Sequence, residues 1–438
     1  SKAPLHYFLV VSGGIHISLK RENVTNLDFM ENCGGKKFEE FLECAIPPGD
    51  RLVRYSLNPC ANCGPEIGLV TANAEIITQR INGKETLATV SVMVKACTKC
   101  DNFRQLFPNV LEVEISFYKY ILPALKQFVV DQGGCKVLDF FPKFHGVFSS
   151  SQSDAYDEDA ILLIENVEEP GQQVTYLQCP GYNFETTNNI LRDLAIFHAV
   201  PIAFKSVNAD KFIGQVIPHL QYRRTYQDMS EKLESELLDI AIKAARLSAE
   251  GEELLPRVVK AIGDNLLNFS TKDLQMESEQ FLTIIHNNLY LDNVVAKFEN
   301  DIHVENKFVG LNMLEYGSLA RDLVFVLLMS VNMEVLKESY WEFIRGYYNT
   351  FISVLMELNC DTHQYTLELL QEEIRRMGGT MEFLHVMLTT SQLYGQQKDA
   401  QPIEDDTEVD LLSEVEQYER CLQRMHEIIL FFGRASWI

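Results

Sequence analysis

The 438-residue sequence predicts an α+β fold with two unequal parts, a small one built on strands and a larger one that is mostly helical. Two observations support this prediction. Between residues 51 and 96, apolar and polar residues alternate in segments separated by turn residues, as in half-buried strands. From about residue 185 onward, amphipathic runs typical of packed helices predominate, including 225–268, 319–358 and 364–394.

Composition narrows the classes of partner. With 46% hydrophobic residues the chain can bury a large core. Its formal charge of −24 disfavours nucleic acid and anionic membranes and favours a neutral or basic protein surface. No apolar run is long enough to span a membrane, and the apolar stretch near the start is too short for a signal peptide. The ten cysteines are therefore expected to be mostly reduced thiols in a cytoplasmic protein.

The first 49 residues predict an extension before the main fold. A β-hairpin turns at Ser12-Gly13-Gly14, and a short helix covers 36–46. The hairpin is expected to attach to the small part of the fold. Its exposed strand edge, within residues 5–20, is a candidate docking surface for a protein partner. The alternative is that the hairpin merely covers the core.

The small part is predicted at residues 50–165. Its strands lie at 51–59, 77–81 and 86–96, with a final strand at 161–166. A helical stretch spans 103–130 between the last two of these strands.

The large part is predicted at residues 166–438. It contains a helix over 188–199, and Gly378-Gly379 marks a break in its last helical block. The segment 403–417 has seven acidic residues and no basic one, so it is expected to be a solvated loop and helix start, with an acidic docking segment as the alternative.

Residues 281–312 have the layout of a phosphotransferase catalytic core. Apolar runs at 281–285, 294–298 and 306–312 predict a strand, a polar loop and two further strands. Such a core requires a carboxylate to accept the proton of the attacking hydroxyl, an Asn for one magnesium ion, and an Asp after the next strand for the bridging metal.

The loop His286-Asn287-Asn288-Leu289-Tyr290-Leu291-Asp292-Asn293 resembles the H-G-D-L-W-x-x-N-N motif of the ecdysteroid kinase-like (CHK kinase-like) family, whose relatives include choline and aminoglycoside kinases. The later motif F-V-D-F-Q stands here as 308–312, and Y-G-S-x-x-x-D-L is kept from Tyr316 to Leu323. The resemblance implies a two-lobed, protein-kinase-like fold over most of the chain.

The resemblance places two substitutions at catalytic positions. Asn288 stands where the family has its catalytic Asp, and Gly310 stands where it has its second metal-binding Asp. An amide cannot accept a proton at neutral pH, and glycine has no side chain to hold a cation. The sequence therefore predicts a pseudokinase with no catalytic cofactor, although Asp292 is an alternative base four positions further along the loop.

The resemblance also assigns vestigial nucleotide-binding residues. Lys95 matches the lysine that reaches the phosphates, Glu114 matches its helix partner, and Asn293 keeps the metal-binding Asn. The Lys–Glu pair is either a structural salt bridge or part of a nucleotide site. The phosphate-covering loop is matched by 71–76, which has no glycine and carries Glu75, so ATP binding is expected to be weak or absent.

Two C-x-x-C pairs form a second candidate site. The first pair is Cys60 and Cys63, and the second is Cys97 and Cys100, with 33 residues between the pairs. Four thiolates at this spacing could hold a structural zinc ion. In a three-stranded antiparallel meander the first and third strands end at the same edge, so the pairs could meet. The alternative is four unrelated buried thiols.

Three functional hypotheses follow. The first is a catalytically inactive kinase-like protein that binds other proteins or forms part of a larger assembly. The second is a small-molecule kinase with rearranged chemistry, acting on a steroid or choline-like hydroxyl. The third is a non-catalytic module that binds a small ligand.

Overall fold

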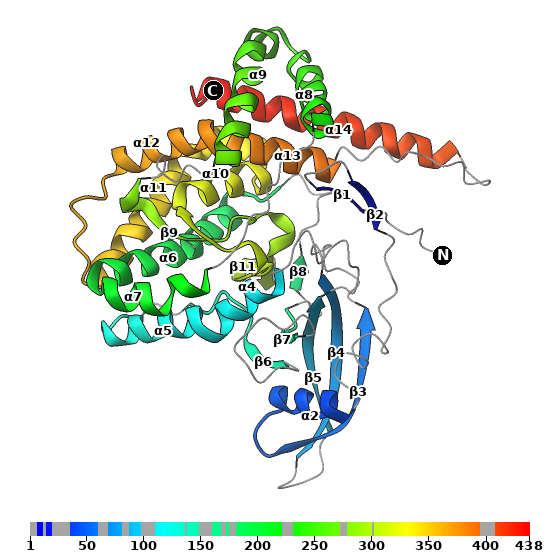
Figure 1. Cartoon of the computed structure of the whole chain (residues 1–438), viewed down its shortest axis with the longest axis vertical. Helices are drawn as coiled ribbons and strands as arrows, with labels where there is room; N and C mark the ends of the chain where they lie inside the picture. Colours follow the sequence, from blue (N-terminus) through cyan, green and yellow to red (C-terminus); the bar gives the residue numbers. More distant parts are fainter. Residues whose placement is uncertain are drawn as a thin grey trace.

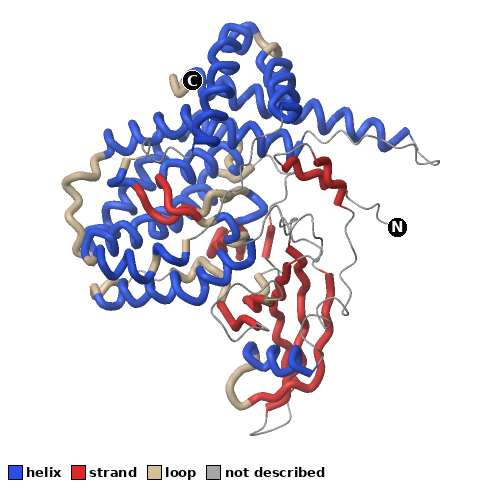
Figure 2. Tube along the Cα trace, viewed as in Figure 1, coloured by secondary structure: helices blue, strands red, loops and turns tan. Residues whose placement is uncertain are grey.

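The computed structural model describes residues 7–11, 15–19, 36–59, 69–80, 87–97, 110–135, 138–148, 160–167, 172–174, 181–220, 231–271, 278–299, 302–394 and 408–438. The chain forms a β-sheet region and a larger helical region (Figures 1 and 2). The α+β architecture predicted from the sequence is confirmed.

The β-sheet region is built on one antiparallel five-stranded sheet. Its strands are β3 (Asp50–Pro59), β4 (Leu69–Arg80), β5 (Leu87–Cys97), β6 (Phe144–Phe148) and β7 (Ile161–Glu165). Their order is β3-β4-β5-β7-β6, with neighbouring strands antiparallel. All four predicted strands are present, although β4 begins eight residues earlier than expected.

Alternate side chains of β5 pack into two different hydrophobic cores, one on each face of the sheet. Val92 and Val94 point to one face of the sheet, where they pack with Phe41 of α2 (Lys36–Leu42). Met93 belongs to the second core, which continues into the helical region. Because successive side chains of a strand point to opposite faces, Lys95 lies on the same face as Met93, and it is fully buried.

The predicted N-terminal elements are present. The helix α2 continues into a 3₁₀ turn, Glu43–Ala45, and β1 (Tyr7–Val11) pairs with β2 (Ile15–Leu19) as an antiparallel hairpin. The expected position of the hairpin is wrong, however. Within the described residues, β1 contacts α13 of the helical region, and α2 is the element that covers the outer face of the five-stranded sheet.

One long helix follows the third strand. It consists of α4 (Val110–Ser116), a π-helical turn (Phe117–Ile121) and α5 (Leu122–Asp131), with helical backbone angles at both joints. The predicted helix over 103–130 is confirmed from Val110 onward, and the part before Val110 lies outside the described residues.

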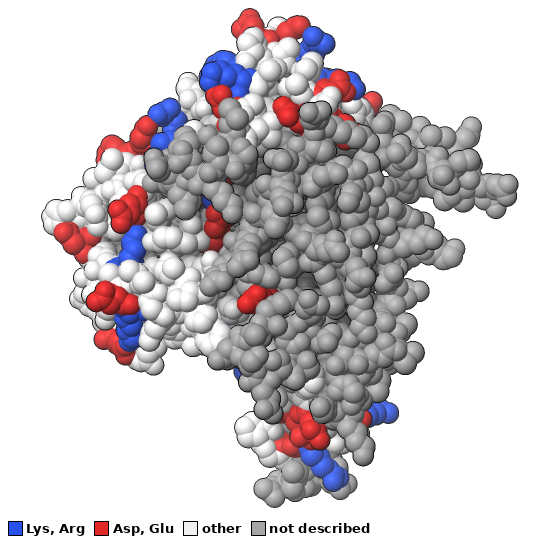
Figure 3. Space-filling view, in the orientation of Figure 1, with Lys and Arg blue, Asp and Glu red and all other residues white. Residues whose placement is uncertain are grey.

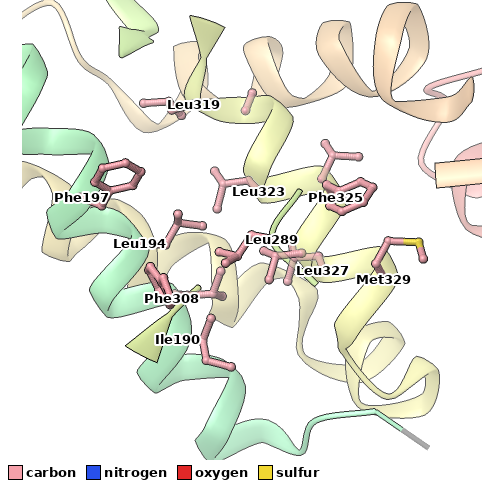
Figure 4. Close-up of a cluster of buried hydrophobic side chains, with 14 of the residues drawn as sticks. Ile190, Leu194, Phe197, Leu289, Phe308, Leu319, Leu323, Phe325, Leu327 and Met329 are labelled. Carbon is pink, nitrogen blue, oxygen red and sulfur yellow. The ribbon is translucent and has the colours of Figure 1, made fainter. Parts of the chain in front are cut away.

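The helical region contains α6 (Phe184–Val207), α7 (Ala209–Gln215), α8 (Glu231–Ala245), α9 (Ala249–Thr271), α10 (Leu319–Ser330), α11 (Met333–Glu357), α12 (Leu367–Met377), α13 (Phe383–Tyr394) and α14 (Glu408–Arg434). The helix α10 lies at the centre, with every residue buried. Figure 4 shows its Leu323 close to Leu194 and Phe197 of α6. No helix in the described part of the chain has the length and apolarity that a membrane crossing requires.

Five short strands lie within the helical region. They are β8 (Gln172–Val174), β9 (Leu282–Ile285), β10 (Val294–Glu299), β11 (Ile302–Phe308) and β12 (Glu315–Ser318). The strands β11, β10 and β8 form one small sheet, and β12 pairs with β9 in another. The predicted succession of strand, loop, strand and strand over 281–312 is confirmed.

The predicted break at Gly378-Gly379 is wrong. These glycines begin a π-helical turn, Gly378–Glu382, that joins α12 directly to α13. A Cβ atom on Gly378 would lie 2.7 Å from Cε3 of Trp437, and one on Gly379 would lie 2.1 Å from the Trp437 carbonyl oxygen. The glycines therefore permit the C-terminal segment to pack against the helix, and they do not end it.

Candidate functional site

The candidate catalytic loop connects β9 to the 3₁₀ turn Leu291–Asn293. Asn287 adopts the left-handed conformation, with φ of 62°. This is the position at which the family motif has glycine, and asparagine tolerates the left-handed region better than most residues do. Asn287 can therefore adopt the left-handed conformation without a glycine at this position.

The Asp322 carboxylate holds the start of this loop. It accepts hydrogen bonds from the backbone N–H groups of His286 at 2.6 Å and Asn287 at 2.7 Å. It also lies 3.1 Å from Nε2 of His198, whose Nδ1 is 2.8 Å from the Tyr347 hydroxyl. Burial alone raises the pKa of Asp322, but the hydrogen bond and charge of His198, together with His286, hold it below its ordinary value.

A buried arginine holds the other side of the loop. Arg321 donates from a terminal guanidinium nitrogen to Oδ1 of Asn287 at 2.8 Å and from Nε to Oε1 of Glu382 at 2.9 Å, and it lies 3.4 Å from Glu315. Nδ1 of His385 is 2.9 Å from Glu382. Burial raises the pKa of Glu382, yet His385 and Arg321 bring it below its usual range.

Sequence reasoning missed most of these supporting residues. The sequence placed Asp322 in the Y-G-S-x-x-x-D-L motif and His198 in the predicted helix over 188–199, but it assigned neither residue a supporting role. A histidine and an arginine inside apolar helical runs are the signal that could have drawn attention to them, because such residues are seldom buried without partners.

Asn288 and Gly310, the two positions predicted to carry catalytic substitutions, both lie next to Asn293. The side chain of Asn293 donates from Nδ2 to the Asn288 carbonyl oxygen at 2.8 Å. Gly310 has φ of 70°, and a Cβ atom there would lie 2.5 Å from Oδ1 and 2.8 Å from Cγ of Asn293. The amide of Asn293 therefore fills the space into which a side chain at position 310 would begin.

The structure also brings Lys95 and Glu114 together. The Lys95 ammonium lies 3.0 Å and 3.1 Å from the two carboxylate oxygens of Glu114, and both side chains are fully buried. The pair connects β5 to α4. This is the pairing expected from the resemblance, and its geometry is compatible with either a structural or a nucleotide-binding role.

A model of the ecdysteroid kinase-like family matches residues 70–360, which is more than half of the chain. The chain belongs to this family. Its kinase-like architecture agrees with the sheet region, the long helix and the helical region described above. A search of curated proteins gave no match.

Several solved kinases are similar in structure at low sequence identity. A microcompartment-associated aminopropanol kinase has 10% identity and a TM-score of 0.44, with 87% of this chain and 92% of that chain covered. A spectinomycin phosphotransferase solved with ADP and spectinomycin has 11% identity and a TM-score of 0.42, covering 92% and 98%. An ethanolamine kinase from Plasmodium vivax has 9% identity and a TM-score of 0.37, covering 84% and 81%.

Asp292 is the remaining acidic group in the catalytic loop of this ecdysteroid kinase-like protein. It lies in the 3₁₀ turn between the buried residues Leu291 and Asn293, and its own side chain is half-buried. Burial raises the pKa of Asp292 to about 6. A carboxylate with such a pKa can exchange a proton near neutral pH.

The predicted phosphate-covering loop is wrong. Residues 71–76 lie within β4 and pair with strands on both sides; Glu75, for example, pairs with Ser56 of β3 and Ser91 of β5. The alternation of apolar Ala74 and Ile76 with polar neighbours makes this segment a half-buried strand. The connection between β3 and β4 is instead formed by 60–68, which lies outside the described residues.

Three of the four candidate zinc ligands, Cys60, Cys63 and Cys100, lie outside the described residues, and only the backbone of Cys97 is described, at the end of β5. The strand pairing agrees with the topological part of the prediction, because β3 and β5 both pair antiparallel with β4 and therefore end at the same edge. Within the described residues, no group of three or more His, Cys, Asp or Glu side chains could hold a metal ion.

Proposed function

We propose that this member of the ecdysteroid kinase-like family is a pseudokinase that acts by binding another protein, either singly or within a larger assembly. The observation that supports the loss of catalysis is the contact between Asn293 and Gly310. A metal-binding carboxylate at position 310 would need the space that the Asn293 amide occupies, and Asn288 provides no base at the expected position.

The expected loss of rate is large. Removal of a general base alone lowers the rate by about 10²–10⁴-fold. Without a carboxylate at position 310, the bridging metal ion is not held, and this ion is the main neutraliser of charge on the transferred phosphoryl group. The loss of the base and the loss of the metal ion act on one catalytic unit, so their effects need not add.

Retention of the scaffold supports a binding role. The bonds from Asp322 and Arg321 still hold the catalytic loop, and Lys95 still pairs with Glu114, although the catalytic carboxylates are absent. The net charge of −24 favours a partner whose surface is neutral or basic. Acidic and basic side chains are interspersed on the face of the helical region seen in Figure 3, so recognition would depend on shape as well as charge.

The test is an assay of metal-dependent ATP turnover with steroid, choline-like and aminoglycoside acceptors. Wild type should show no turnover above that of Asn293→Ala. Turnover in wild type that disappears in Asn293→Ala would contradict the proposal. A thermal-shift titration with ATP and magnesium adds a binding measurement, because saturation at a hundred times the dissociation constant would stabilise the protein by about 2.7 kcal/mol. Because Gly310 has no carboxylate to hold the metal ion that bridges the phosphates, we expect no such shift.

The pKa of Asp292 supports a second candidate function, a small-molecule kinase in which Asp292 replaces the missing base. This candidate predicts slow turnover that rises with pH as Asp292 loses its proton near pH 6. Asp292→Asn should then abolish the turnover, whereas Asp210→Asn, at an exposed position on α7, should leave it unchanged. Equal rates in the two variants would exclude the candidate.

A further inference from the structure

We infer that the long helix from Val110 to Asp131 is a strut between the β-sheet region, here called the small lobe, and the helical region, here called the large lobe. The strut holds the two lobes in one fixed arrangement when no nucleotide is bound. The inference stands apart from the proposed loss of catalysis, because such a helix would brace an active kinase equally well. It depends on contacts at three levels along one continuous helix.

The first level attaches the helix to the small lobe. In α4, Glu114 pairs with Lys95 of β5, and neither side chain has any exposed surface. In the π-helical turn, the ring of Tyr118 stacks on Phe144 of β6, with 5.8 Å between ring centroids and 8° between ring planes. Two strands of the five-stranded sheet are thereby tied to the first half of the helix.

The second level lies at the π-helical turn itself. Phe117 packs edge-on against Phe141 at 4.8 Å and against Phe197 of α6 at 6.4 Å. Its sequence neighbour Tyr118 faces the small lobe. A π-helical turn adds a residue to the helical repeat and so changes the face that the following residues present. The turn lets one helix contact both lobes.

The third level attaches the helix to the large lobe. Phe128 of α5 stacks on Phe204 of α6, with 4.6 Å between ring centroids. Just beyond the helix, the Cys135 N–H donates to Glu357 of α11 at 2.7 Å. A Cβ atom on Gly134 would lie 2.9 Å from Leu358, so the chain also packs closely there.

The chain that follows the helix adds a second brace. Lys307 of β11 donates to the Asp139 carbonyl oxygen at 2.7 Å, and the Phe308 N–H donates to the Phe140 carbonyl oxygen at 2.7 Å. The Glu165 N–H, at the end of β7, donates to the Lys143 carbonyl oxygen at 2.8 Å. Closure of two domains requires a few residues that absorb the motion, and the bonds from β11 to Asp139 and Phe140 restrain the segment that follows the helix.

Hydrogen exchange in the full-length protein tests the strut. Phe128→Ala removes the stacking on α6, fourteen residues or about 20 Å along the helix from Glu114. If the strut couples the lobes, amides of α4 and β5 should exchange about tenfold faster in this variant than in wild type. Phe432→Ala is the matched control, because Phe432 is equally buried and packs against Phe383 in the large lobe, away from the helix. It should change exchange in α4 and β5 by less than about twofold.

If amide exchange in Phe128→Ala becomes faster only in α5 and α6, the inference is overturned. If that variant does not fold, Phe128→Leu serves in its place, with about threefold faster exchange expected in α4 and β5. Unchanged exchange in α4 and β5 in Phe128→Leu, alongside faster exchange in α5, would likewise overturn it.

Discussion

At the scale of single residues, the side chain of Asn293, which matches the family motif, lies in the space next to Gly310. Gly310 provides both a positive φ angle and an empty Cβ position, and Asn293 uses the space. Restoring the family's aspartate at position 310 would therefore meet two obstacles, the backbone conformation and the Asn293 amide.

We expect Gly310→Asp to lower the free energy of unfolding by about 1–3 kcal/mol, the usual cost of a residue in a strained conformation, and to restore no activity. Urea denaturation measures the change. Gly214→Ala is the control, since it has ordinary backbone angles and open space around its Cβ position, and it should be neutral or slightly stabilising. A Gly310→Asp protein as stable as wild type would show that Asn293 moves aside easily.

The buried carboxylate of Asp322 predicts a dependence on pH. Its pKa is lowered in the folded protein, so its stabilising contribution is present above the ordinary pKa of 3.8 and is lost as pH falls through the lower folded value. Asp322→Asn should destabilise the protein by about 3–5 kcal/mol at pH 7, because it leaves a buried network incomplete. In urea titrations, this difference should stay constant from pH 7 to about pH 5 and narrow below the ordinary pKa. A difference that narrows already between pH 7 and pH 5 would contradict the assignment.

At the scale of elements, the Lys95–Glu114 pair connects a strand to a helix. If the pair is structural, Lys95→Met alone should cost about 3–5 kcal/mol, since it leaves a buried carboxylate without its partner. The double variant Lys95→Met/Glu114→Leu should recover most of that loss, because two apolar side chains replace two charges. Chemical denaturation of wild type, Lys95→Met, Glu114→Leu and the double variant gives the coupling between the residues. A double variant as unstable as the sum of both single variants would contradict a structural role.

The ends of β3 and β5 give the proposed zinc site its topological basis. We expect the protein purified without chelator to contain about one zinc ion per chain, and Cys60→Ser/Cys63→Ser to contain none. Cys360→Ser, which changes a buried thiol in the helical region, is the control and should keep the metal. Elemental analysis measures the number of zinc ions per chain in the three proteins. Absence of zinc from wild type, with rapid alkylation of the four thiols, would leave them as ordinary cysteines.

At the scale of the whole molecule, the N-terminal extension divides into two elements with different roles. Phe41 and Leu42 of α2 are buried against the five-stranded sheet, so this helix is part of the fold. The hairpin β1–β2 is a separate two-stranded sheet that contacts α13. A protein that begins at Gly49 would lack both elements. Loss of partner binding could then result either from misfolding without α2 or from loss of the hairpin.

A variant that lacks residues 1–30 separates the two roles. We expect it to keep the melting temperature of wild type, because α2 remains, and to lose affinity for the protein partner if the hairpin edge is the docking surface. Binding to the native partner and thermal unfolding measure the two effects. Unchanged affinity in a folded variant would show that the partner binds elsewhere.

The local features of this protein can be predicted from short stretches of its sequence. The period-2 pattern of β5, the amphipathic helices after residue 185, and the hairpin around Ser12-Gly13-Gly14 depend on nearby residues, so they could be predicted. The motif in the sequence likewise led to the prediction that Asn288 and Gly310 replace two carboxylates, and this remains a prediction.

Features that depend on residues distant in sequence become visible only in the folded chain. The inward turn of Asn293 over Gly310, the buried links from Arg321 and His198 to the catalytic loop, and the contact of the hairpin with α13 have no local signal. The glycines at 378–379 illustrate the reason, because Trp437, almost sixty residues later, determines why they are needed. Steric exclusion and buried polar pairing act between whole elements, and a linear pattern does not contain that information.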